Sequence, residues 1–271
     1  DLFDEQSASL KAHIRLQQQL ERLDQHGIQT FICHGNHDPF HPHAFPLAWP
    51  ESVFVFTDEK VSAVPFYKKD KLAAMIYGFS YTGKHISQNK PAEYVKTKDD
   101  CFHIGMLHGN AEGDPDRDAY APFKINDLIR KNFDYWALGH IHTHTILAED
   151  PLIVYPGNIQ GLHPKETGEK GCVLVTLKSG GAKSTFIATA DLEWKEVSVA
   201  ITDFISLNDL IDRLKRMKEN LRAPGIDTLV RVTLTGFGQL NDVLRSDGVA
   251  EDLLEDLQSG EDLKRPFVWV T

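Results

Sequence analysis

Apolar residues near the start of the chain recur at helical spacing. They fall roughly on one face of a helix: Leu10, Ile14, Leu20 and Leu23. Gly27 follows this segment, and glycine commonly ends a helix. The pattern predicts an amphipathic helix over residues 7–26.

Runs of β-branched and aromatic residues bounded by turn residues predict most of the remaining elements up to residue 200. We expect strands at 28–34, 53–56, 61–67, 72–79, 101–110, 135–144, 173–178, 184–190 and 194–201, with a helix at 124–132. Beyond residue 200 the pattern predicts a helix at 206–222, a strand at 228–235 and an acidic helix near 240–258. This order predicts an α/β fold with stacked sheets over residues 1–200, followed by a small α/β domain over residues 201–271.

Composition narrows the class of protein. The 271 residues suit one large domain or two smaller ones, and the net charge of −10 argues against a general positive coating for nucleic acid. We find no apolar run of membrane-spanning length and no signal peptide, so we expect no membrane partner. Cys33, Cys101 and Cys172 lie singly in apolar runs. This usage is typical of buried thiols in a reducing compartment, and we expect a cytoplasmic protein.

Charge is unevenly distributed along the chain. Residues 60–98 carry eight lysines and two acidic residues, a local net charge of +6, whereas residues 241–263 carry eight acidic residues and one arginine, a net charge of −7. The basic segment either faces an anionic partner or is a well-solvated lysine-rich loop.

Histidine-containing polar segments follow three predicted strands: HGNHD at 34–38, LHGN at 107–110 and GHIHTH at 139–144. The first is also an ordinary turn sequence, because Asn, Asp and Gly favour turns. In an extended chain alternate side chains point the same way, so His140 and His142 are expected to face one point. Gly109 and Gly139 would allow the backbone to lie close to a site there.

Imidazole, carboxylate and amide oxygens together suit divalent cations of intermediate hardness. Two cations about 3.5–4 Å apart need a shared anionic ligand. Asp1, in the segment DLFDEQS, offers such a carboxylate. No nucleophilic Ser or Cys motif is evident, and no GxxxxGK[ST] phosphate loop occurs, so the chain itself is not expected to hydrolyse ATP.

The order D-x-F-D, GNHD, LHG and GHIH resembles that of the calcineurin-like metallophosphoesterase superfamily, and most nearly its SbcD/YhaO-type DNA repair exonucleases. The segment YPGNIQGLHPKETGEKGC at 155–172 resembles the one that follows GHxH in YhaO-like proteins. The resemblance covers about residues 1–200 and implies an α/β/β/α sandwich. Residues 201–271 are similar only in position to the capping domain of these nucleases, and we expect that domain to be incomplete.

The resemblance also implies roles for individual residues. Asp1 would bridge two divalent metal ions, with Mn²⁺ the expected metal. One metal would be completed by Asn36, His108 and His140, and the other would receive His142. His37 would act as general acid or charge stabiliser at the scissile phosphate, and Asp38 would orient its ring.

One family motif has no counterpart. The D-x-H motif normally precedes D-x-F-D, so we expect the chain to be truncated before it, to hold one metal or none, and to leave a strand edge unpaired.

Three functions stay open at the level of sequence. The first is a DNA phosphodiesterase, an exonuclease in the intact protein. The second is a phosphatase or phosphodiesterase acting on nucleotides or other small phosphoesters, since one fold hosts many activities. The third is a non-catalytic scaffold for an ATPase partner. Neutralising Lys68, Lys69 and Lys71 is expected to weaken cleavage only if DNA is the substrate. By resemblance, a coiled-coil ABC-type ATPase and a second copy of the chain are the expected protein partners.

Overall fold

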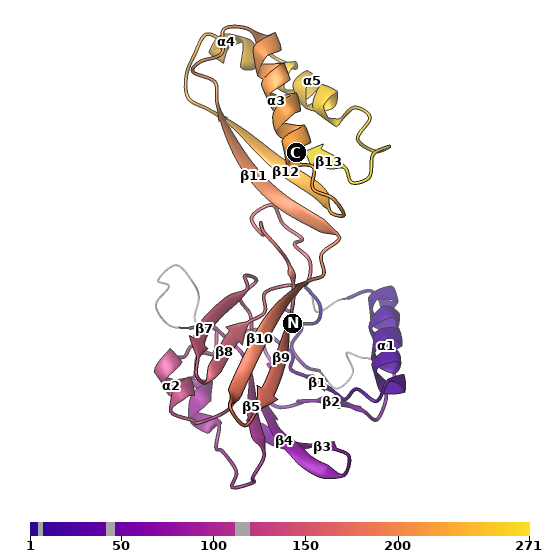
Figure 1. Cartoon of the computed structure of the whole chain (residues 1–271), viewed down its shortest axis with the longest axis vertical. Helices are drawn as coiled ribbons and strands as arrows, with labels where there is room; N and C mark the ends of the chain where they lie inside the picture. The colour runs from indigo at the N-terminus through magenta and orange to yellow at the C-terminus, as the bar shows by residue number, and fades with distance from the viewer. Residues whose placement is uncertain (5–7, 42–46, 112–119) are drawn as a thin grey trace. The chain divides into compact units, whose positions relative to one another are not determined.

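The computed structural model describes residues 1–4, 8–41, 47–111 and 120–271, and it consists of two compact units (Figure 1). Unit 1 comprises Asp1–Gly157 and Val173–Thr185, and unit 2 comprises Asn158–Cys172 and Phe186–Thr271. The mixed α/β architecture expected from the sequence is confirmed.

A mixed six-stranded sheet forms the centre of unit 1, in the order β3-β4-β5-β6-β8-β7. Its strands are β3 (Ser62–Lys68), β4 (Lys71–Gly78), β5 (Phe102–His108), β6 (Tyr135–Gly139), β7 (Thr145–Glu149) and β8 (Leu152–Tyr155). The four inner strands are mutually parallel, whereas β3 and β7 pair antiparallel at the edges. Inner parallel strands are covered on both faces, which explains why β8 is buried along its whole length.

The remaining elements of unit 1 surround this sheet. Helix α1 (Leu10–Gln25) begins at Ser9, whose side chain accepts a hydrogen bond from the Ala12 N–H, so the helix expected over residues 7–26 is confirmed for its described part. Strands β1 (Thr30–Ile32) and β2 (Val53–Val55) form a parallel pair. The others are η1 (Lys90–Glu93) and α2 (Ile125–Ile129). Strands β9 (Gly171–Lys178) and β10 (Gly181–Ala188) form a further two-stranded sheet.

Aromatic packing holds the core of unit 1 together. Trp136 on β6 is fully buried and stacks on Phe133, with 4.9 Å between ring centroids. On the neighbouring strand β5, a Cβ added to Gly105 would lie 2.4 Å from the Trp136 ring. A larger residue at 105 would therefore displace the indole.

Unit 2 is a three-stranded parallel sheet in the order β11-β12-β13, with helices on one face (Figure 1). The strands are β11 (Leu192–Ala200), β12 (Asp227–Thr235) and β13 (Val268–Val270), and the helices are α3 (Leu207–Leu221), α4 (Asn241–Leu244) and α5 (Val249–Gln258). Leu210 and Leu214 of α3 pack with Val230 of β12 in its core. The single acidic helix expected near 240–258 is instead two helices, because Gly248 adopts a left-handed conformation (φ 84°) between them.

Strand β11 belongs to unit 2, not to a first domain ending at residue 200 as expected. It pairs with β12 from Leu192↔Asp227 to Ala200↔Thr235. Parallel neighbours need a crossover connection, here through α3. A strand pattern alone does not reveal a partner that lies beyond an intervening helix.

All three cysteines are free thiols, but Cys172 is exposed and Cys33 and Cys101 are half-buried, so the expectation of buried thiols is wrong for Cys172 and holds only in part for the other two. No helix in the described parts of the chain is long and apolar enough to cross a membrane.

Candidate metal centre

The polar segments singled out in the sequence meet at the carboxyl ends of neighbouring strands. His108 is the last residue of β5 and pairs with Gly139, the last residue of β6. The Gly35–Asp38 turn follows β1, which ends at Ile32. Parallel strands present their carboxyl ends at one edge of a sheet, and this edge is a common location for ligand sites in α/β proteins.

The side-chain oxygen of Asn36 is the point of convergence. It lies 2.9 Å from His108 Nε2 and 3.1 Å from His140 Nδ1. Adjacent ligand atoms around a divalent cation, each about 2.1 Å from the metal, are about 3 Å apart in octahedral geometry. The three atoms are therefore spaced as metal ligands would be.

Asp1 completes this cluster. Its Oδ2 lies 3.4 Å from His108 Nε2, and its Oδ1 accepts a hydrogen bond of 3.0 Å from the His37 backbone N–H. The backbone passes so close that a Cβ on Gly35 would lie 2.1 Å from Asp1 Oδ1 and 2.4 Å from His108 Cε1. Only glycine fits at position 35 without displacing these two side chains.

His140 reaches the cluster by an unusual backbone conformation. Strand β6 ends at Gly139, and His140 has a φ of 97°, which is rare for a residue with a side chain. Its ring packs against Tyr120, with 4.8 Å between centroids. The argument that His140 and His142 alternate along one strand is therefore wrong, because the strand has ended. His142 is exposed, although its charge contributes to the electrostatics at His108.

His37 lies beside the cluster with its ring held by Asp4. Its Nδ1 lies 3.0 Å from the Asp4 carbonyl oxygen and 3.4 Å from Asp4 Oδ1. A carbonyl oxygen can only accept, so Nδ1 carries the proton and Nε2 is the nitrogen that remains for a substrate. The ring is 40% exposed, so a substrate can reach it.

Asp38 does not orient His37, contrary to the expectation from the sequence. Its carboxylate accepts hydrogen bonds from the backbone of Leu2, Phe3 and Gly35, and it faces His34. Burial by itself would raise the pKa of Asp38, but its hydrogen bonds to His34 and Leu2 outweigh this effect and hold the pKa below its ordinary value. Asp38 is therefore a charged, buried anchor, and Asp4 has the place beside His37 that was expected of Asp38.

The electrostatics at His108 suit a metal ligand. Burial, with a contribution from the neighbouring imidazole of His140, lowers the pKa of His108 well below its ordinary value. The ring is therefore neutral, which is the form of histidine that binds metals.

Within the described part of the chain, no three His, Cys, Asp or Glu side chains are arranged as a metal site by themselves. The donor set of Asp1, His108 and His140 fits a divalent cation only together with the Asn36 carboxamide oxygen.

Two residues at this edge were missed or undervalued in the sequence. Asp4 stands in the D-x-F-D segment, three residues after Asp1, and that spacing was the available signal. Tyr81 carries no motif; its hydroxyl donates to the His108 carbonyl oxygen (3.2 Å), and its ring lies edge-on to His108.

Five of the eight lysines of the basic segment lie at two places. Lys68, Lys69 and Lys71 lie at the β3–β4 turn, whereas the site lies beyond the other end of β4. That strand is eight residues long, so this turn is roughly 23 Å from the site edge at about 3.3 Å per residue. Lys60 and Lys84 are exposed at the site edge. Lys60 lies two residues before Ser62, which pairs with Gly78 at the end of β4. Lys84 lies four residues after Ser80, whose N–H donates to the Asp58 carbonyl oxygen.

Several known proteins are similar to this chain. The family model described as "Metallophosphoesterase YhaO, middle domain" matches residues 194–271. The metallophosphoesterase YhaO of Bacillus subtilis is 38% identical over 270 residues, covering 99% of this chain and 66% of that protein. The DNA double-strand break repair protein Mre11 of Methanocaldococcus jannaschii is 25% identical over 80% of this chain and 61% of its own length. Mre11 of Sulfurisphaera tokodaii is 27% identical over 81% of this chain and 57% of its own length.

The chain thus spans just under two thirds of the length of these relatives. The match to YhaO covers 99% of the chain and so runs through both units. These similarities are consistent with the calcineurin-like metallophosphoesterase family, whose members generally bind divalent metals.

Proposed function

We propose that this chain carries the active site of a metal-dependent DNA phosphodiesterase, an exonuclease acting in DNA repair. The observation that carries the proposal is the convergence of His108 and His140 on the Asn36 oxygen, with the exposed ring of His37 beside it. A phosphodiester needs both features, a centre of positive charge and a proton donor for its leaving oxygen.

In this proposal one cation is held by Asn36, His108 and His140, with Asp1 bridging to a second cation that receives His142. Mn²⁺ suits this mixture of nitrogen and oxygen ligands. When bound, such cations supply Lewis-acid activation of the phosphoester and of the attacking water.

The chain's own residues orient the His37 ring and protonate the leaving oxygen. As the acid, His37 carries a proton on each ring nitrogen; the Nε2 proton passes to the departing oxygen, while the Nδ1 proton stays on the Asp4 carbonyl and the ring is left neutral. Because that contact restricts rotation of the ring, His37 is already oriented when a substrate arrives.

Support for DNA as the substrate comes from the name of two relatives, DNA double-strand break repair protein Mre11. Association with a coiled-coil ATPase and formation of a homodimer are parts of the same proposal and rest on the resemblance in the sequence.

Two measurements test the proposal. The chain is loaded with Mn²⁺ and desalted, and bound metal is counted; it is then assayed on single-stranded DNA, duplex DNA and bis(p-nitrophenyl) phosphate. We expect bound Mn²⁺ and release of nucleotides from DNA ends. Cleavage of the small diester without any cleavage of DNA would replace DNA by a small phosphoester as substrate. A chain that binds Mn²⁺ and cleaves nothing would favour the scaffold.

Lysines at the site edge are expected to matter more than the lysines of the distant turn. Replacing Lys60 and Lys84 with glutamine should lower kcat/KM on duplex DNA several-fold at low salt and reduce its salt dependence, since each lost phosphate contact removes about 0.9 from the salt slope. The matched variant, in which Lys68 and Lys71 become glutamine, removes the same charge far from the site. If the second variant had the larger effect, DNA would cross the β3–β4 turn.

A further inference from the structure

We propose that Asp38 is a positioning residue that ties the segment carrying Asp1 to the turn carrying Asn36, and so holds the two metal-ligating groups in register. This inference rests on the proposed function of the site. It gives Asp38 a role in metal affinity and none in orienting the proton donor His37.

The contacts of Asp38 reach both segments at once. Its Oδ2 accepts from the backbone N–H groups of Leu2 (2.6 Å) and Phe3 (3.2 Å), the two residues that follow Asp1. Its Oδ1 accepts from the Gly35 N–H (3.1 Å), immediately before Asn36. One side chain therefore bridges positions about 35 residues apart in sequence.

A carboxylate is the side chain that these contacts require. Three N–H groups point at two oxygens, and both oxygens of an ionised carboxylate accept. A carboxamide has a single acceptor oxygen, so Asn at 38 could satisfy one segment but not both. Asp38 is only 5% exposed, and water is therefore poorly placed to substitute for a lost acceptor.

Asp38 also contacts a residue outside the metal cluster. His34 is fully buried, and its Nδ1 lies 3.4 Å from Asp38 Oδ2 and 3.0 Å from the Asp38 carbonyl oxygen. The His34 backbone N–H donates in turn to Ser80 Oγ (2.8 Å), just beyond β4. This chain of contacts attaches the carboxylate to the central sheet, so the anchor is fixed to a rigid element.

The consequence is that two ligands from different segments share one support. Asp1 Oδ1 and His108 both lie next to Gly35. Any shift of the Gly35–Asp38 turn relative to residues 1–3 therefore changes the distance between Asp1 and the other ligands. Residues that support metal ligands through hydrogen bonds typically alter metal affinity or activity by about 10- to 100-fold when they are replaced.

The test compares Asp38→Asn and Asp38→Glu with Asp4→Asn in the whole chain. Mn²⁺ affinity is measured by titration calorimetry, and the amide signals of Leu2, Phe3 and Gly35 are followed by ¹⁵N NMR without metal. We expect Asp38→Asn to weaken Mn²⁺ binding about 10- to 100-fold and to shift the amide signal of at least one segment. Asp38→Glu keeps the charge and both oxygens and should weaken binding less. Asp4→Asn should leave Mn²⁺ affinity unchanged.

Each result decides between the roles. If Asp38→Asn leaves both Mn²⁺ affinity and the three amide signals unchanged, the positioning role is wrong. The same holds if Asp38→Asn lowers only turnover and leaves Mn²⁺ affinity unchanged. If Asp38→Asn fails to fold, two measurements still test the contacts. One is the Mn²⁺ affinity of Asp38→Glu. The other is the position of the three amide signals in the unsubstituted chain, because a charged acceptor moves an amide signal downfield. A chain that binds no Mn²⁺ before substitution would overturn the metal site itself, and with it this inference.

Discussion

Replacing His37 with asparagine is expected to lower kcat on a DNA phosphodiester by about 100- to 10,000-fold, the usual contribution of a positioned general acid. The alkoxide leaving group of DNA is a strong base and needs a proton as it departs. His37 is the residue whose ring is exposed beside the cluster and held at Nδ1 by Asp4. Asparagine keeps a polar group near the position of Nδ1 but cannot transfer a proton to the leaving oxygen.

The measurement is steady-state kinetics on two substrates that differ in their leaving group. With bis(p-nitrophenyl) phosphate the leaving group is a weak base, so the loss in kcat should be much smaller than with DNA. Mn²⁺ affinity should not change, because His37 is not among the proposed ligands. His26→Asn removes an exposed imidazole at the end of α1 and serves as the control. Equal losses of kcat on both substrates would argue that His37 stabilises charge on the phosphate and does not act as an acid.

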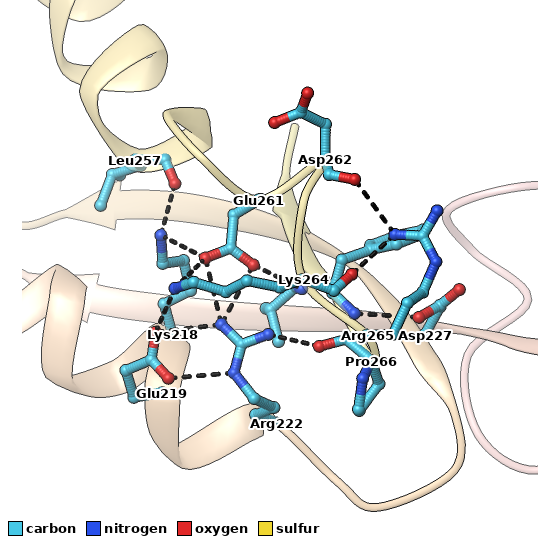
Figure 2. A network of polar contacts seen from close by, with 12 residues as sticks. Lys218, Glu219, Arg222, Asp227, Leu257, Glu261, Asp262, Lys264, Arg265 and Pro266 are labelled. Carbon is cyan, nitrogen blue, oxygen red and sulfur yellow. Dashed lines mark hydrogen bonds and ion pairs between the residues drawn. The ribbon is translucent and has the colours of Figure 1, made fainter.

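Replacing Glu261 with alanine is expected to destabilise unit 2 by about 3–5 kcal/mol, the usual cost of removing one partner from a buried ionic network. Figure 2 shows the cationic side chains that converge on this fully buried carboxylate. Lys218 of α3 and Arg222, the residue that follows α3, lie 3.0 Å from its oxygens, and Lys264 lies 2.9 Å away. The Val268 N–H of β13 donates to it at 3.0 Å. Loss of Glu261 leaves the buried ammonium of Lys218 without its carboxylate partner.

The same network predicts how stability depends on pH. Burial by itself would raise the pKa of Glu261, but the Val268 N–H and the surrounding cations outweigh this and lower it from 4.5 to about 2. A lowered folded-state pKa contributes stability that is fully present above pH 4.5 and is lost as the pH falls toward 2. The shift corresponds to a contribution on the order of 3 kcal/mol at neutral pH. Glu261→Gln should therefore reduce the acid sensitivity of unit 2 between these two values, and Glu219, whose pKa is also lowered to about 2 by Arg222, should account for part of what remains.

Hydrogen exchange of peptides from β12 and α5, with urea unfolding at pH 7 and at pH 3, measures these effects in the whole chain. Asp256→Asn is the control, because Asp256 pairs with Lys215 at 2.9 Å but both side chains are about half exposed. Such a pair contributes about 0–1 kcal/mol. If Glu261→Ala lowered the free energy of unfolding no more than Asp256→Asn does, the network would behave as a set of solvated charges.

The site residues differ in how far the sequence could identify them. Asn36, His108 and His140 each follow an apolar run that specifies a strand locally, so their common location at one sheet edge could be expected in advance. The role of Asp38 could not. Two carboxylates, Asp4 and Asp38, compete for His37, and the outcome depends on where the first residues of the chain lie relative to the turn after β1.

Local pattern therefore determined most of the helices and strands of this protein, though not β7, β8 or β13, and the identity of its reactive side chains, because side-chain periodicity and turn chemistry are properties of neighbouring residues. Tertiary structure alone decided which elements pair and which donors meet. It assigned β11 to β12 across a helix and moved Lys68 and Lys71 to the far end of β4. It also gave the buried Asp38 the backbone N–H groups of Leu2 and Gly35 as partners. The physical reason is that a strand pattern specifies which face a residue occupies, whereas its partners depend on segments brought close only by folding.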